Sequence, residues 1–301
     1  MLKNLLDNSK IFKLVCGAGN ENEQEIYELV SLYAKAGCKF FDLCAKPEIV
    51  KSAKKALADV GVEDAYLCVS VGIKNDPHVS KAVVDKEKCL KCGKCKDVCL
   101  QNAISGMGTV DKKNCIGCAK CYKICPTKAI SIHSEEKILS EVLPEIIELG
   151  IDCIEFHAMG LDEEEIESKW SYINSIYDGM LSICTSRGKL GDEQMIARIK
   201  NMIKNRAPYT TMVQADGFPM SGGQDDYKTT LQAVATAEIV QNANLPVYLI
   251  LSGGTNSKTG SFAKMCGINY NGIAIGSYAR KIIRNQTNAI EIAKNLIKSV
   301  E

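Results

Sequence analysis

The chain has 301 residues, of which 46% are hydrophobic, and its formal net charge is +1 at pH 7. This ordinary globular composition carries no electrostatic footprint for nucleic acid or an anionic membrane, so neither is expected as a partner. The first residues lack the apolar core of a signal peptide, and no run is long enough to span a membrane. Together with the fifteen cysteines, these features indicate a reducing compartment, and we expect a cytoplasmic protein.

Outside residues 76–134, short β-rich runs alternate with amphipathic helical runs. Several of the β-rich runs are almost continuously apolar, as expected of parallel strands that are covered on both sides. We expect strands at Ile11–Ala18, Cys38–Ala45, Ala65–Gly72, Asp152–Met159, Met180–Ser186, Tyr209–Asp216, Pro246–Ser252 and Gly272–Ser277. We expect helices at Glu21–Ala36, Glu48–Val60, Lys137–Leu149, Asp162–Ser175, Asp192–Asn205, Asp226–Asn242, Lys258–Cys266 and Thr287–Val300.

Eight strand–helix units in about 245 residues are typical of a TIM (β/α)8 barrel. A doubly wound open sheet is the alternative. In the barrel interpretation, residues 1–75 carry strands 1–3, residues 135–301 carry strands 4–8, and residues 76–134 form a small α+β domain inserted after strand 3. Because the active sites of such barrels are built from the loops that follow the strands, we expect the inserted domain at the rim of the site.

The inserted segment contains two cysteine runs with the same spacing. They read Cys89-x-x-Cys92-x-x-Cys95-x-x-x-Cys99 and Cys115-x-x-Cys118-x-x-Cys121-x-x-x-Cys125-Pro126. This is the spacing of bacterial ferredoxins, in which three cysteines of a run bind one [4Fe–4S] cluster and the fourth binds the other cluster. The spacing therefore predicts two [4Fe–4S] clusters, a first held by Cys89, Cys92, Cys95 and Cys125 and a second held by Cys115, Cys118, Cys121 and Cys99.

The two runs belong to an internal repeat of 26 residues that keeps every cysteine in register, as a ferredoxin-like domain with two clusters requires. One difference is Leu100, which stands where a proline is expected after the first run. Zinc sites and disulfides are the alternatives, but zinc sites use paired cysteines with longer spacers, and nothing marks the chain for export. A radical S-adenosylmethionine enzyme is excluded because the chain has no Cys-x-x-x-Cys-x-x-Cys run.

Glycines cluster where the seventh and eighth expected strands end. The residues are Gly253, Gly254 and Thr255 after strand seven, and Gly276 and Ser277 after strand eight. Loops seven and eight are the usual phosphate site of this fold, because their backbone amides can approach an anion closely. We therefore expect a phosphate-bearing ligand at these residues, with FMN as one candidate. The alternative is that the glycines only form tight turns.

Acids, an imidazole and thiols lie near the ends of several expected strands. Because residues i and i+2 of a strand share a face, such side chains would gather at the barrel mouth, where polar residues are often functional. The candidates for catalysis are Glu155, His157, Asp216, Cys16, Cys44 and Cys184. The alternative for the three thiols is that they are small buried hydrophobic residues, as we expect for Cys38, Cys68, Cys153 and Cys266.

The connector from Gln214 to Asp226 combines an acid, several glycines and a Phe-Pro-Met sequence before a helix. Since loops after barrel strands carry function, we interpret it as a substrate loop or lid. A surface turn without a role is the alternative.

Four short sequences outside the cysteine runs resemble the light-dependent period protein family. They are residues 12–18, Asp76-Pro77-His78, residues 216–222 and Gly253-Gly254-Thr255-Asn256. The resemblance covers nearly the whole chain. That family was named in cyanobacteria for an iron–sulfur protein with two clusters that supplies redox state to a circadian clock. The resemblance implies redox sensing through Cys89 to Cys125, without implying a clock for this chain.

Two hypotheses follow for the function. In the first, the protein is an iron–sulfur redox protein for electron transfer or redox sensing, and its partner is a redox protein or electron donor. In the second, it is an oxidoreductase whose clusters feed electrons to a flavin or to a small-molecule substrate at the barrel mouth, where Glu155, His157, Asp216 or a thiol handles protons.

Overall fold

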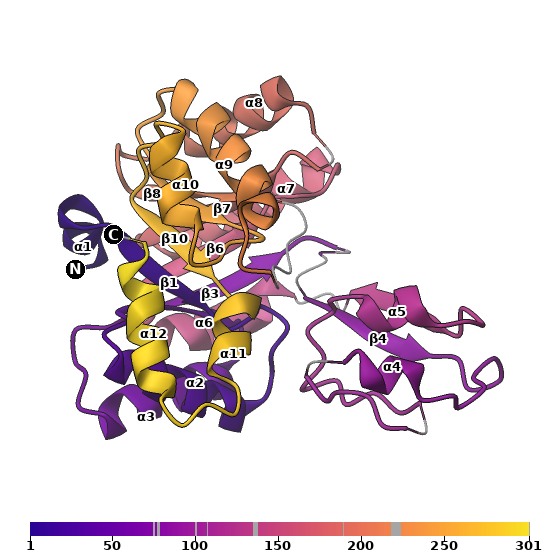
Figure 1. The fold of residues 1–301 in the computed structure, drawn as a ribbon. Coiled ribbons are helices and arrows are strands. Elements are labelled where there is room, and N and C mark those ends of the chain that lie inside the picture. The colour runs from indigo at the N-terminus through magenta and orange to yellow at the C-terminus, as the bar shows by residue number, and fades with distance from the viewer. Residues whose placement is uncertain are drawn as a thin grey trace.

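In the computed structural model, eight parallel strands close into a barrel in the order β1-β10-β9-β8-β7-β6-β3-β2 (Figure 1). The structure describes residues 1–300 except 75, 77, 78, 100, 107, 135–137, 189 and 218–223. The strands are β1 (Ile11–Val15), β2 (Phe40–Cys44), β3 (Tyr66–Gly72), β6 (Cys153–His157), β7 (Met180–Ser186), β8 (Thr211–Asp216), β9 (Tyr248–Ser252) and β10 (Gly272–Ile275). The predicted TIM barrel is confirmed, and the open-sheet alternative is wrong.

Helices follow the strands and cover the outside of the barrel (Figure 1). They are α2 (Glu23–Lys35), α3 (Pro47–Asp59), α6 (Leu139–Glu148), α7 (Glu163–Ile176), α8 (Asp192–Ile203), α9 (Tyr227–Asn242), α10 (Thr259–Met265) and α12 (Ala289–Lys298). Asn22, Asp162 and Asp226 start three of them, because each side chain accepts a hydrogen bond from a backbone N–H of the first turn. All eight expected helices are present with small shifts at their ends.

Two helices are additional to the sequence-based expectation. The first, α1 (Leu2–Asn8), lies at the end of the barrel opposite the inserted domain (Figure 1). Its Leu2 and Leu6 pack on an apolar layer inside the barrel, which includes Phe40, Met212 and Tyr248. The second, α11 (Ser277–Ile283), begins two residues after β10, so that strand ends earlier than expected. The leucines of α1 and this layer thus make one end of the barrel interior apolar.

The inserted domain projects from the barrel mouth between β3 and α6 (Figure 1). An antiparallel pair of strands, β4 (Ser80–Val84) and β5 (Ile130–Ser134), starts and ends it, and the short helices α4 (Lys94–Asp97) and α5 (Lys120–Ile124) lie between them. Its small core contains Ala82, Ala103, Ile104 and Ile130 beside the cysteines. The predicted insertion after the third barrel strand is confirmed. Among the helices in the described ranges, none has the length and apolar character to cross a membrane.

Candidate functional site

The eight cysteines of the two runs lie around two cavities. The first cavity is lined by Cys89, Cys92, Cys95 and Cys125. The second is lined by Cys99, Cys115, Cys118 and Cys121. Each run contributes three cysteines to one cavity and its fourth to the other. The fourth cysteines, Cys99 and Cys125, come just after α4 and α5, and these two helices pack against each other, which brings each fourth cysteine to the cavity of the other run. This is the grouping that the ferredoxin spacing predicts.

The surroundings of the sulfur atoms fit metal-bound thiolates. Backbone N–H groups donate to three of them, from Lys91 to Cys89 Sγ at 3.4 Å, from Ala82 to Cys115 Sγ at 3.3 Å and from Ala129 to Cys125 Sγ at 3.3 Å. Burial raises the pKa of Cys125, but its hydrogen bonds outweigh burial and leave the pKa below its ordinary value. Four thiols around each cavity are the donor set of a [4Fe–4S] cluster, and N–H···S bonds are the contacts that stabilise one.

Close contacts hold the second run against β4 of the insert and, through Lys81, against the barrel. Gly117 lies so close to the β4 backbone that a Cβ at this position would be 2.2 Å from the carbonyl oxygen of Ser80. The side chain of Lys81 is 2% exposed, and its Nζ donates to the carbonyl oxygens of Gly19, in the β1–α2 loop, and of Cys115, at 2.9 Å. One buried ammonium therefore joins the second cysteine run to the barrel.

A cavity of about 670 Å³ lies between the barrel mouth and the second run. Residues 116–119 of the insert, including Cys118, form one wall. The opposite wall contains the ends of the barrel strands, including Glu155, His157 and Asp216. All five residues expected to bind phosphate also line it, namely Gly253, Gly254, Thr255, Gly276 and Ser277. Thus a prospective cluster ligand, three predicted catalytic residues and the glycine-rich loops share one space.

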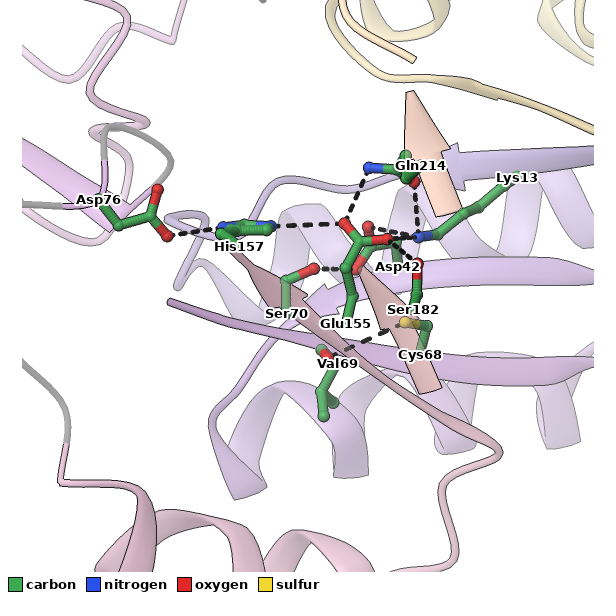
Figure 2. Close-up of polar contacts among 10 residues, drawn as sticks. All are labelled: Lys13, Asp42, Cys68, Val69, Ser70, Asp76, Glu155, His157, Ser182 and Gln214. Atoms are coloured by element: carbon green, nitrogen blue, oxygen red, sulfur yellow. Dashed lines mark hydrogen bonds and ion pairs between the residues drawn. The ribbon is translucent and has the colours of Figure 1, made fainter. Parts of the chain in front are cut away.

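Below this cavity, Lys13 is the centre of a buried polar network (Figure 2). Its Nζ lies 2.6 Å from Glu155 Oε2 and 3.1 Å from Asp42 Oδ2, and it donates to Gln214 Oε1 at 3.0 Å. Gln214 Nε2 donates in turn to Glu155 Oε1 at 2.8 Å. Ser182 donates to Glu155 Oε2 at 2.9 Å. Lys13 is 1% exposed, so its charge is stable only because these groups surround it.

His157 extends this network toward the inserted domain (Figure 2). Its Nδ1 is 2.6 Å from Asp76 Oδ2, and its Nε2 is 3.4 Å from Glu155 Oε1. Burial lowers the pKa of His157, but the two carboxylates outweigh burial and hold the pKa well above its ordinary value. The two carboxylates thus favour the protonated ring, which lies at the cavity wall with Nδ1 directed at Asp76 and Nε2 at Glu155.

The pKa values of the two acids beside Lys13 are shifted in opposite directions. Burial raises the pKa of Asp42, and the nearby Glu155 adds to this effect, so its pKa lies above the ordinary value although Lys13 opposes the shift. Burial also acts on Glu155, but Lys13 and His157 outweigh it and lower its pKa. The pair thus combines an ionised carboxylate with one that protonates more readily, as proton-handling sites require.

Glu155, His157 and Cys184 also have the geometry of a metal-binding group, with ligand atoms within 4.8 Å of one another. A protonated imidazole has no lone pair for a metal ion. Burial, together with Asp216, raises the pKa of the Cys184 thiol well above its ordinary value. A metal ion could bind here only with release of the protons on His157 and Cys184.

None of the three candidate thiols, Cys16, Cys44 and Cys184, is among the described residues that line the mouth cavity. Cys16 and Cys44 are fully buried and belong to the larger hydrophobic core, which includes residues of the outer helices. Burial raises the pKa of Cys16, which keeps this thiol protonated. The expected loop from Gln214 to Asp226 is described only at its ends, because residues 218–223 lie outside the described part of the chain.

Several residues of this site were not predicted from the sequence, namely Lys13, Ser70, Ser182 and Arg280, and neither was the role of Asp76. Arg280 lines the mouth cavity and donates to the Cys16 carbonyl at 2.6 Å. Lys13 had a recognisable signal, since it interrupts the apolar run Ile11-Phe12-Lys13-Leu14-Val15. A lysine at the centre of a buried strand requires a buried acid. The sequence did not show which acid, because Glu155 lies 142 residues away.

Comparisons with known proteins agree with both parts of the molecule. A family model described as the light dependent period A C-terminal domain matches residues 145–301, and a 4Fe–4S binding domain model matches residues 82–105 and 109–131. The protein "Light dependent period A" of Synechococcus elongatus is 31% identical over 256 residues, which are 82% of this chain and 72% of that protein.

Among solved structures, a truncated 3-deoxy-D-arabino-heptulosonate 7-phosphate synthase from Thermotoga maritima is similar with a TM-score of 0.52. The two chains are 10% identical, and the match covers 96% of this chain and 84% of that one. At this identity the similarity shows the barrel fold alone.

Proposed function

The chain belongs to the light dependent period A family, and on this premise we propose that it is a redox protein carrying two [4Fe–4S] clusters, for electron transfer or redox sensing. The observation that supports the proposal is the grouping of the eight cysteines into two sets of four, each around its own cavity. Bound there, the clusters would supply single electrons. The first set holds Cys89, Cys92, Cys95 and Cys125, and the second holds Cys99, Cys115, Cys118 and Cys121.

The test uses protein purified without oxygen. We expect about eight iron atoms and about eight acid-labile sulfides per chain, and an electron paramagnetic resonance signal after reduction in which two clusters interact. Zinc in place of iron, or about four irons per chain, would contradict the proposal.

The cavity shared by Cys118, His157 and the glycine-rich loops favours a second candidate function, an oxidoreductase. We propose that its substrate bears a phosphate group, bound by the backbone amides of the two glycine-rich loops and by the guanidinium of Arg280. FMN is one such ligand, and no described residue selects it over other phosphate-bearing molecules. The rest of the ligand would lie between His157 and the second run.

In this function the chain's own residues handle protons. The proton that His157 would give to a ligand is the one on Nε2, whose contact with Glu155 is long at 3.4 Å, while Asp76 holds Nδ1 at 2.6 Å and keeps the ring in place. Lys13 is the nearer counter-charge of Glu155, because its Nζ lies 2.6 Å from Oε2 whereas His157 Nε2 lies 3.4 Å from Oε1. A proton that leaves His157 is replaced by one from solvent, which restores the imidazolium.

Two measurements test the second candidate. Any flavin released from the pure protein is identified by chromatography. Binding of inorganic phosphate is followed by the broadening of its ³¹P resonance, which a reduced, paramagnetic second cluster should increase. Arg280→Gln should weaken this broadening. The matched control is Arg284→Gln, because Arg284 directly follows α11 and borders the second cysteine cavity as Arg280 does, but does not line the mouth cavity. Equal broadening in both variants would contradict the assigned phosphate site.

A further inference from the structure

The inserted domain is basic although the whole chain is nearly neutral. Residues 76–134 contain eleven lysines and five acidic residues, whereas the chain as a whole has a net charge of +1. Five of the lysines follow one another around the first cysteine run, and all five are exposed: Lys86, Lys88, Lys91, Lys94 and Lys96. Residues 85–97 contain three acids, Asp85, Glu87 and Asp97, and Asp85 pairs with Lys88 at 3.0 Å. The outer end of the domain therefore carries an excess of unburied positive charge.

The first cysteine cavity opens to this charged surface. Lys91 and Lys94 line the cavity together with Cys92, and the Cys92 side chain is exposed. Leu90 also lines it and is 69% exposed. An apolar side chain surrounded by lysines, beside an exposed metal ligand, has the composition of a transient protein interface.

The two cysteine cavities differ in what else borders them. The lining of the first comes from the inserted domain alone, within residues 84–130. The second is bordered by α2 and α11, and Cys118 also lines the mouth cavity. An electron that enters from another protein and is used at the barrel mouth would therefore meet the first site before the second.

We propose that the exposed face of the first run, formed by Lys91, Lys94 and Lys96 around Leu90 and Cys92, is the docking surface for a small acidic one-electron carrier protein. The inference rests on the proposed two-cluster function. The carrier gives up one electron and is oxidised, and the site held by Cys89, Cys92, Cys95 and Cys125 gains that electron, with no bond made or broken. Complementary charge increases the encounter rate, and Leu90 provides the apolar centre of a small, short-lived interface.

The experiment measures electron entry and binding separately in the cluster-loaded full chain. A pre-reduced, acidic plant-type [2Fe–2S] ferredoxin is mixed with the protein in a stopped-flow instrument without oxygen, and binding of the oxidised ferredoxin is measured by calorimetry. Lys91→Glu/Lys94→Glu should slow the second-order reduction about tenfold at low salt and weaken binding, and high salt should remove the difference. The matched control is Lys228→Glu/Lys294→Glu, which changes net charge equally at exposed positions on α9 and α12.

The outcomes separate this inference from the function on which it rests. Wild-type protein without iron and sulfide would contradict the two-cluster function. Loaded protein that dithionite reduces normally, but whose ferredoxin kinetics and binding are the same in both double variants, would overturn the docking surface alone. If Lys91→Glu/Lys94→Glu loses iron, Lys96→Glu replaces it, because Lys96 belongs to the proposed surface but does not line the cavity; Lys294→Glu is then the control, and the same criteria apply.

Discussion

The two cysteine runs have the same spacing but different surroundings. In the first run Cys92 is exposed and lysines surround the cavity. In the second run Cys115 and Cys121 are buried, and Lys81 joins the run to the barrel. Equal spacing thus groups the cysteines in the same way in both runs, while the neighbouring residues decide whether a cavity opens to the outer surface of the insert or borders the barrel mouth.

Substitution of a single cysteine of either run has the largest expected effect, which is the loss of one cluster. If ligation is crossed, Cys125→Ser should lose the same cluster as Cys92→Ser, about four of eight irons, and leave the same residual paramagnetic signal. Cys99→Ser should match Cys118→Ser in the same way. Iron analysis and electron paramagnetic resonance check the result. A Cys125→Ser signal identical to that of Cys118→Ser would show that each run ligates its own cluster.

Removal of the buried ammonium under the mouth cavity comes next. Lys13→Met should lower the free energy of unfolding by about 3–5 kcal/mol, because Glu155 and Asp42 are left buried without their cation. Lys13→Met/Glu155→Gln should recover part of the loss. Denaturant unfolding without oxygen is the measurement, and Lys35→Met, at an exposed position, is the control. Equal midpoints for Lys13→Met and Lys35→Met would contradict the network.

The contact between the second run and the barrel can be broken by one substitution. Lys81→Met should lower the free energy of unfolding by about 1–3 kcal/mol, because the carbonyl oxygens that Lys81 Nζ contacts lose their donor. Its effect on the paramagnetic signal should be confined to the second cluster. Lys86→Met, near the first run, should leave both unchanged. A change in the signal of the first cluster alone would contradict the assignment of the Lys81 contact to the second run.

The smallest expected effect is on pH dependence. The pKa of His157 is raised in the folded protein, so its stabilising interaction is complete below the ordinary value of 6.5 and is lost as pH rises through the folded pKa. Thermal unfolding of the wild type should therefore show a decline in stability above pH 6.5 that His157→Gln lacks. Nuclear magnetic resonance of the three histidine rings measures the pKa directly. A His157 pKa at or below 6.5 would contradict the imidazolium.

The barrel and the insert could be predicted because their signals are local. Each strand is an apolar run, and each ligand is fixed by a spacing of two or three residues. The inward face of a strand was harder to assign. In β1 the inward residues are Ile11 and Lys13, whereas Cys16 follows the end of the strand and lies in the larger hydrophobic core. A strand that is apolar on both faces gives no alternation from which to read its orientation.

The charge network could not be read from the sequence for a different reason. Lys13, Asp42 and Glu155 are brought together only when the barrel closes, and the partners of His157 come from β6 itself and from the connection to the insert. Such pairings depend on strand order and register, which no local pattern specifies. The helix α1 was missed because seven residues with two buried leucines are too short for a clear period.

The most direct test of the whole account is X-ray diffraction at the iron absorption edge from crystals grown without oxygen. We predict two anomalous iron sites, one among Cys89, Cys92, Cys95 and Cys125 and one among Cys99, Cys115, Cys118 and Cys121, with the second beside the mouth cavity. A single iron site, a zinc edge at either position, or a second cluster turned away from the cavity that His157 lines would contradict it.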